Sequence, residues 1–135
     1  MNPLSTELYW LTATTLLTGL LWIPYIVNRL LEQGILKALW DPQGETATRR
    51  PWAQRLMNAH QNAVENLVVF APLVLMIDRV GAVNATTGLA VVIYFFARLG
   101  HALVFTLALP VLRVLLFLVG FSCQMVLALT LFGWL

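Results

Sequence analysis

The chain has 135 residues, of which 60% are hydrophobic and only 10% are charged, and its mean hydropathy is +0.82. Soluble domains average about 25% charged residues, so this composition excludes a soluble globular domain. The formal net charge of +2 is too small to indicate nucleic-acid binding, and we expect no nucleic-acid partner. We therefore expect the chain to act in or beside a lipid bilayer.

Four apolar runs succeed one another, at about residues 8–31, 53–77, 85–107 and 111–134. Each run is long enough to cross the hydrocarbon layer, which is about 30 Å thick, at a rise of about 1.5 Å per residue. They leave almost no sequence for an extramembrane domain. The sequence therefore predicts an all-α integral membrane protein in which residues 1–135 form a single domain of four membrane-spanning helices.

Two prolines lie inside these runs, Pro24 in the first and Pro72 in the second. Proline has no backbone N–H, and its ring crowds the carbonyl group four residues earlier. We therefore expect each proline to kink its helix. Membrane helices tolerate such kinks where neighbouring groups satisfy the freed carbonyl.

The first connection, about residues 32–52, is the longest and contains several turn-forming residues, among them Asp41 and Pro42. Within it, residues 35–40 predict a short helix that lies in the membrane interface. Trp40 and Trp52 fit the belt of aromatic side chains at the level of the lipid headgroups.

Basic residues gather around this connection. The connection and the helix ends beside it carry Arg29, Lys37, Arg49, Arg50 and Arg55. Arg113 lies beside the third connection, whereas the other side has only Arg79, next to Asp78, and the acidic Glu7. Because positive charge marks the cytoplasmic side of a membrane protein, we expect both termini on the non-cytoplasmic side.

A polar stretch opens the second apolar run. Five of its side chains share one face of a helix over about three turns: Arg55, Asn58, Gln61, Asn62 and Glu65. His60 points to another side. Amide and carboxylate groups in hydrocarbon cost several kcal/mol each unless they are paired or face a wet cavity. This polar face of the second helix is therefore the first candidate for the functional site.

Two further stripes lie on the third and fourth helices: Tyr94, Arg98, His101 and Phe105 on the third, and Arg113, Phe117 and Gln124 on the fourth. We expect the charged members of all three stripes, together with Arg29, at one depth in the cytoplasmic half. A single carboxylate against several arginines leaves excess positive charge, which calls for an anionic ligand. Two alternatives stay open: a Glu65–Arg98 ion pair that only fixes the helix register, and arginines that reach the lipid headgroups.

Two segments resemble the family of membrane-associated proteins in eicosanoid and glutathione metabolism (MAPEG). The segment from Arg55 to Glu65, RLMNAHQNAVE, resembles the family's second-helix signature, and the segment from Arg98 to Arg113, with RLGH and PVLR at its ends, resembles the third- and fourth-helix segment. The resemblance covers about residues 20–118. It implies a left-handed four-helix bundle assembled as a homotrimer, with ligand sites between subunits near the cytoplasmic face.

By resemblance, glutathione is the co-substrate, and the residues that bind it are Arg29, Arg55, Asn58, Gln61, Asn62, Glu65, Arg98 and His101. Glu65 would pair with the free amino group of the tripeptide, and Arg113 would be the catalytic residue that holds the sulfur as thiolate. A neighbouring cation lowers the pKa of a thiol below its usual value near 8.5 and so raises the nucleophilic fraction. A lipophilic substrate would arrive through the membrane lipids. No metal site is predicted.

The chain departs from the family's enzymes in lacking hydroxyl groups near Arg113. Those enzymes commonly have a tyrosine where Phe105 stands and another hydroxyl-bearing residue around Val114 or Phe117. Two functions therefore remain open. One is a glutathione-dependent transferase or peroxidase acting on lipophilic electrophiles, and the other is a non-catalytic membrane protein of the same fold that binds a lipid or lipophilic anion.

Overall fold

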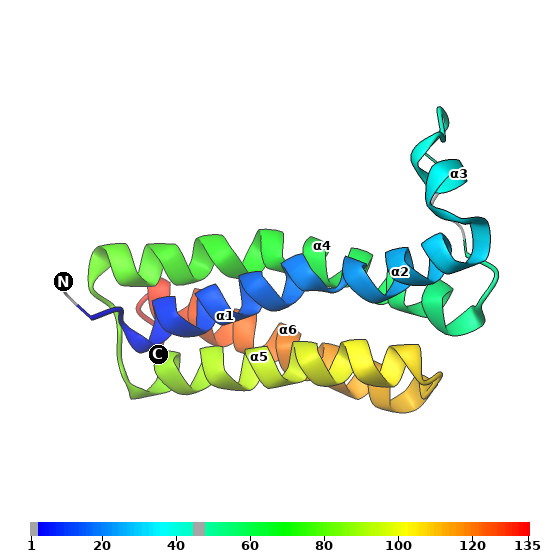
Figure 1. Cartoon of the computed structure of the whole chain (residues 1–135). Coiled ribbons are helices and arrows are strands. Elements are labelled where there is room, and N and C mark those ends of the chain that lie inside the picture. Colours follow the sequence, from blue (N-terminus) through cyan, green and yellow to red (C-terminus); the bar gives the residue numbers. More distant parts are fainter. Residues whose placement is uncertain (1–2, 45–47) are drawn as a thin grey trace.

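The computed structural model describes residues 3–44 and 48–135 (Figure 1). All regular secondary structure in these residues is helical: α1 (Thr6–Leu20), α2 (Trp22–Gln33), α3 (Ile35–Leu39), α4 (Pro51–Val80), α5 (Ala85–Thr106) and α6 (Pro110–Leu131). The predicted all-α class is therefore confirmed for the described part of the chain. Within that part, three helical segments are long and apolar enough to cross a membrane: Thr6–Gln33, Ala85–Thr106 and Pro110–Leu131.

The first predicted helix is divided in two at Leu21, between α1 and α2. The cause lies three residues later, because the ring of Pro24 crowds the carbonyl of Leu20, the last residue of α1. Leu21 keeps helical dihedral angles and its N–H donates to the Thr18 carbonyl at 3.4 Å, so the helical path continues through a local irregularity. Pro72, by contrast, lies inside α4 without ending it.

Helix α4 is the longest, with 30 residues, and it carries the polar stretch. Pro51 occupies its first turn, where the missing N–H would have had no helical partner. It ends at Gly81, whose φ of 72° lies in the left-handed region that favours glycine. Asn84 then starts α5 by accepting hydrogen bonds from the Thr86 and Thr87 backbone N–H groups.

The long helices lie side by side along their lengths, and both ends of the chain lie at one end of the molecule (Figure 1). Helix α5 contacts α1, α4 and α6, while α2 contacts α4. The α2–α4 contact includes a hydrogen bond of 2.7 Å between the Tyr25 hydroxyl and His60 Nδ1. As the helical periodicity indicates, His60 thus points away from the polar stripe of its helix.

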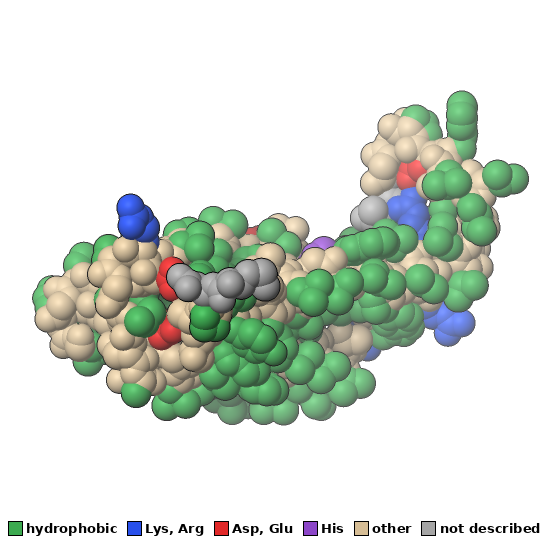
Figure 2. All heavy atoms as spheres, turned by 60° about the vertical axis from the view of Figure 1, so that its left-hand side comes forward, with side chains coloured by type: hydrophobic (Ala, Val, Ile, Leu, Met, Phe, Trp, Pro, Cys, Tyr) green, Lys and Arg blue, Asp and Glu red, His purple; other side chains and the backbone are tan. Residues whose placement is uncertain are grey.

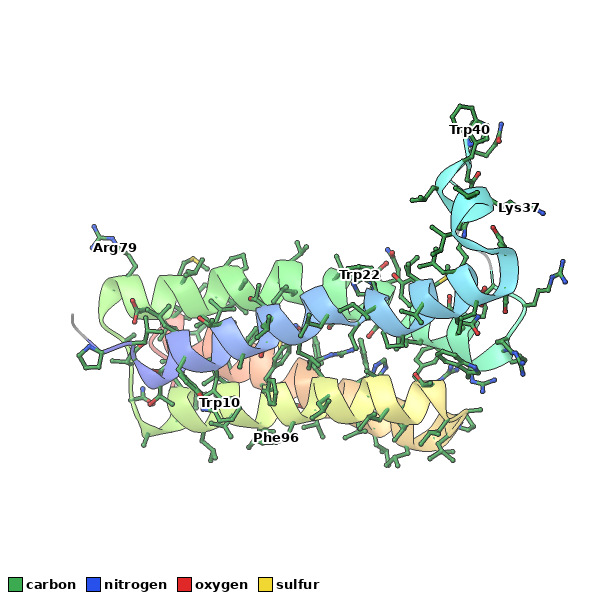
Figure 3. The ribbon with its side chains drawn as sticks, viewed as in Figure 1. Trp10, Trp22, Lys37, Trp40, Arg79 and Phe96 are labelled. Atoms are coloured by element: carbon green, nitrogen blue, oxygen red, sulfur yellow. The ribbon has the colours of Figure 1, made fainter. Side chains whose placement is uncertain are left out.

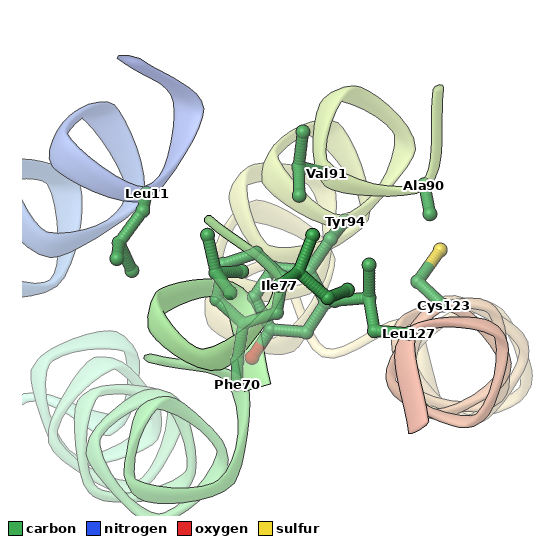
Figure 4. Packing of buried hydrophobic residues seen from close by; sticks show 9 residues of the cluster. Leu11, Phe70, Ile77, Ala90, Val91, Tyr94, Cys123 and Leu127 are labelled. Carbon is green, nitrogen blue, oxygen red and sulfur yellow. The ribbon is translucent and has the colours of Figure 1, made fainter. Parts of the chain in front are cut away.

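The larger of the two apolar clusters in the described part of the chain lies in the half of the molecule nearest the termini, and Figure 4 shows its packing. Its centre is a stack of the Phe70 and Tyr94 rings, with centroids 3.6 Å apart. Around the stack lie apolar side chains from four helices: Leu11, Val74, Ile77, Ala90, Val91, Cys123 and Leu127. The polar stripe of α4, with Arg98 and His101 of α5, lies in the other half.

Hydrophobic side chains also cover the sides of the helices, whereas most of the lysine and arginine side chains visible in Figure 2 lie toward the two ends. Helix α3 forms part of an arm that projects sideways from the end opposite the termini (Figure 1). Trp40 and Lys37 lie on this arm (Figure 3). Trp40 is 87% exposed. The short helix expected at residues 35–40 thus exists as Ile35–Leu39.

Candidate functional site

The site begins on the buried face of α5, where Arg98 and His101 are each only 3% exposed. One terminal nitrogen of Arg98 lies 2.6 Å from Asn62 Oδ1 on α4 and 3.1 Å from His101 Nδ1. Because residues three apart lie on one face of a helix, α5 presents Arg98 and His101 together to α4. The structure thus brings three of the predicted site residues into one cluster.

No acid balances the charge of Arg98. Its Nε and the other terminal nitrogen are buried and make no hydrogen bond to any described residue. Among residues 3–44 and 48–135, the single ion pair joins Arg29 to Asp41, so no carboxylate reaches Arg98. A buried cation without an opposite charge is costly, and such groups in membrane proteins mark functional sites.

Polar side chains extend this cluster toward the aromatic core. Asn66 Nδ2 donates to the Asn62 carbonyl at 2.9 Å, and Gln124 Nε2 on α6 donates to the Asn66 carbonyl at 3.2 Å. Gln124 also lies 3.5 Å from the Tyr94 hydroxyl. The sequence stripes contain Tyr94 and Gln124 but miss Asn66, although Asn66 follows Asn62 by four residues and therefore lies on the same face of α4.

Arg113 lies at the beginning of α6, beside the same cluster. Its guanidinium carbon stands 4.5 Å from the centre of the Phe105 ring. That ring meets His101 edge-on, with centroids 5.6 Å apart, and Phe117 lies 6.5 Å from His101. A cation above an aromatic face is attracted by the ring's quadrupole. Phe105 therefore positions Arg113 near His101 without neutralising its charge.

Arg55 ties the start of α4 to the end of α5. Its Nε donates to the Thr106 carbonyl at 2.8 Å. This carbonyl is in the last turn of α5, where the helix leaves carbonyl groups without helical partners and a cation is favourable. The Nε of Arg55 is therefore occupied by a contact between α4 and α5.

Asn58, Gln61 and Glu65 stay exposed on α4 in the single chain. Gln61 Nε2 donates to Glu65 Oε1 at 3.0 Å. The alternative of a Glu65–Arg98 ion pair is therefore wrong, because Asn62 and not Glu65 faces Arg98. Glu65 remains free to meet a group from outside the chain.

The structure does not bring Arg29 to this cluster. Arg29 is buried against the first connection, where it forms its ion pair with Asp41. The sequence indicates only a turn at Asp41, since its side-chain role depends on how the connection folds back onto α2. No group of three or more potential metal ligands occurs in the described ranges 3–44 and 48–135.

With this geometry in view, the comparisons with known proteins identify the family. A family model for the MAPEG family matches residues 8–133, nearly the whole chain. The chain belongs to the MAPEG family. No curated protein and no solved structure matches it significantly. Together with the three apolar helices, this membership establishes the MAPEG chain as a membrane protein.

Proposed function

We propose that this MAPEG family member is a membrane-bound, glutathione-dependent transferase or peroxidase that acts on lipophilic electrophiles. The observation that carries the proposal is unmatched positive charge at one place. Within residues 3–44 and 48–135, buried Arg98 has no acid partner. Arg113 lies over the Phe105 ring, which contacts His101. Glutathione brings two carboxylates and a thiolate, which suit arginine donors. Family membership supports the same ligand.

In this proposal Arg113 holds the glutathione sulfur as thiolate. With a transferase substrate, the sulfur attacks an electrophilic carbon, a C–S bond forms, and the leaving group departs with its electron pair. With a lipid hydroperoxide, the thiolate attacks the outer oxygen, an S–O bond forms and the O–O bond breaks, and the alkoxide takes up a proton and leaves as the alcohol. The thiol of a second glutathione then attacks the sulfur of the resulting sulfenic acid, which releases water and gives the disulfide. Because Phe105 has no hydroxyl group, it cannot donate a hydrogen bond to the sulfur. The charge of Arg113 therefore stabilises the thiolate by electrostatics alone.

We also propose the assembly that such a site needs. Residues 1–135 form one domain, a left-handed bundle whose four spans include α4, with both termini on the non-cytoplasmic side. Three copies form a homotrimer that covers the exposed polar side chains Asn58, Gln61 and Glu65. A polar face directed at lipid would be costly, and a neighbouring copy removes that cost. Glutathione then lies between subunits, with Glu65 on its ammonium group.

Calorimetry with purified protein in detergent tests the proposal. We expect saturable glutathione binding, an increase in thiolate absorbance in the ultraviolet on binding, and turnover with an activated aryl halide. A glutathione analogue with serine in place of cysteine is the matched ligand control, since it should bind without the absorbance change. Absence of glutathione binding would contradict the proposal.

A second function is favoured by one specific observation. An apolar groove of about 370 Å³ opens where α1 breaks, and its walls come from α1, α2, α4 and α5. It is lined by Leu17, Leu20, Leu21, Pro24, Trp52, Leu56, Leu99, Ala102, Leu103, Thr106 and Leu107. With no hydroxyl at Phe105, the same fold suits a non-catalytic protein that binds a lipid or lipophilic anion. Glutathione binding with neither thiolate signal nor turnover would favour this function.

A further inference from the structure

The hydrogen bonds around Arg98 determine more than the position of one side chain. A guanidinium group can only donate hydrogen bonds. His101 Nδ1, 3.1 Å from the Arg98 terminal nitrogen, must therefore accept, and it carries no proton. In a neutral imidazole the proton then belongs to Nε2, which becomes a hydrogen-bond donor.

The same nitrogen of Arg98 orients Asn62. Two donors, the Arg98 guanidinium at 2.6 Å and Asn66 Nδ2 at 3.4 Å, both meet Asn62 Oδ1. The oxygen of this amide is thus the inward atom, and the Nδ2 group with its two hydrogens points away from Arg98. Asn62 and His101 accept hydrogen bonds from the same Arg98 nitrogen. Their remaining donors, Asn62 Nδ2 and His101 Nε2, therefore form one patch.

That patch lies at the margin of the surface, since Asn62 is half-buried and His101 is 3% exposed. Neither Asn62 Nδ2 nor His101 Nε2 makes a hydrogen bond within residues 3–44 and 48–135. Neither is among the buried side-chain atoms left without a partner, whereas two nitrogens of Arg98 are. The two free donors therefore reach the surface, and the guanidinium behind them is sealed.

We propose that Arg98 is a positioning residue that sets the hydrogen-bond polarity of this patch. It fixes His101 with its proton on Nε2 and Asn62 with its amide nitrogen outward, so that the pair offers only donors and takes a carboxylate oxygen of the ligand. Resting on the proposed function, this assigns a carboxylate of glutathione to Asn62 and His101. The uncompensated charge of Arg98 strengthens both donors, because hydrogen bonds in a low-dielectric site polarise one another.

The first experiment reads the tautomer directly by nitrogen NMR of protein labelled with ¹⁵N in the histidine imidazole. The chain has two histidines, so a His60→Gln variant leaves the signals of His101 alone. We expect ligand-free wild type to show an unprotonated Nδ1 and a protonated Nε2. A proton on Nδ1, or on both nitrogens, would overturn the proposal whether or not the protein binds any ligand.

Two variants at Arg98 test the cause. Arg98→Met removes the donor, and we expect His101 to populate both tautomers. Arg98→Lys keeps a charged donor, and we expect it to restore the Nε2–H form. If Arg98→Met retained the Nε2–H form alone, something other than Arg98 would set the tautomer. If Arg98→Met does not fold, the spectra of wild type and of Arg98→Lys still show which tautomer His101 adopts beside a charged donor.

Asn62→Asp tests the outward donor, since aspartate still accepts from Arg98 but presents an oxygen in place of the amide nitrogen. We expect its glutathione affinity to fall at least tenfold with no loss of thermal stability. Unchanged affinity would overturn the assigned carboxylate contact. If wild type shows the expected tautomer but binds no glutathione, the proposed function fails, while the tautomer assignment stands.

Discussion

At the scale of single residues, two arginines have different roles in the proposed site. The Arg98 side chain is buried, and one of its terminal nitrogens donates hydrogen bonds to Asn62 and His101. Arg113 is half-buried and lies on the face of Phe105, with its charge unmatched among the described residues. Only Arg113 is therefore placed to meet a ligand sulfur.

Replacement of Arg113 is the sharpest test of catalysis. We expect Arg113→Leu to keep most of its glutathione affinity, because other groups hold the carboxylates. Turnover with an activated aryl halide should fall by about 10²-fold or more, the scale for removal of one preorganised electrostatic stabiliser. Arg79→Leu, at the opposite end of the molecule (Figure 3), is the control and should change neither value. Equal turnover in both variants would assign Arg113 to binding or packing.

Replacement of Glu65 should weaken glutathione binding with little effect on the stability of the protein. It is exposed in the single chain and bonds only to Gln61 among the described residues. Glu65→Gln should therefore change the stability of the ligand-free protein by about 0.5 kcal/mol or less. Glutathione affinity should fall about 10- to 100-fold, the value of a hydrogen bond to a charged group. Thermal melts and calorimetry check both, with Gln61→Met as the matched variant that keeps the carboxylate.

At the scale of elements, α5 packs against α1, α4 and α6. Gly120 of α6 is buried against α5. A Cβ atom there would lie 3.6 Å from Arg98 Cδ and 3.7 Å from a Tyr94 ring carbon. Those are ordinary contacts, so one methyl group fits, and a larger side chain would displace Arg98.

Gly120 variants test this packing. We expect Gly120→Ala to be tolerated and to gain up to about 1 kcal/mol from its higher helix propensity. Gly120→Leu should lose about 1–3 kcal/mol through overpacking and should disturb the His101 imidazole. The control is Gly19→Leu, since nothing lies within 4 Å of a Cβ at that position. Detergent thermal melts give the ranking, and a stable Gly120→Leu protein would contradict the contact.

At the scale of the whole molecule, polarity is segregated along the helix axes. The apolar core around Phe70 and Tyr94 lies toward the termini. The cluster around Arg98 lies toward the end of the molecule that carries α3 (Figure 1). Both chain ends lie at the same end of the molecule (Figure 1). Which end faces the cytoplasm is a proposal from charge alone.

Cysteine labelling decides that orientation. In a Cys123→Ala background, we expect a cysteine at Gln43 to be protected from an impermeant reagent in intact cells. A cysteine at Val83, which is exposed on the opposite connection, should react. The reverse pattern would place both termini inside.

Assembly is checked by native mass spectrometry in detergent. We expect three chains, because three exposed polar side chains of α4 need a covering surface. A monomer that binds glutathione at full affinity would contradict both the trimer and a site between subunits.

The sequence by itself determined the features that depend on local composition and periodicity. Apolar runs longer than a bilayer is thick predicted the helices, to within about three residues at each end, a typical boundary error. Pro24 predicted the disruption that appears at Leu21. The helical stripes of α4 and α5 placed Asn62, Arg98 and His101 on facing surfaces.

Only the tertiary structure decided which of these side chains meet. Periodicity gives the face of a helix but not its rotation and height relative to a neighbour. The sequence therefore suggested Glu65 as a partner of Arg98, whereas Asn62 is the partner in the structure. Likewise Arg29 was expected in the cluster, but the first connection folds back and pairs it with Asp41. Hydrogen bonds act over about 3 Å, a range that helix packing sets and that sequence spacing does not.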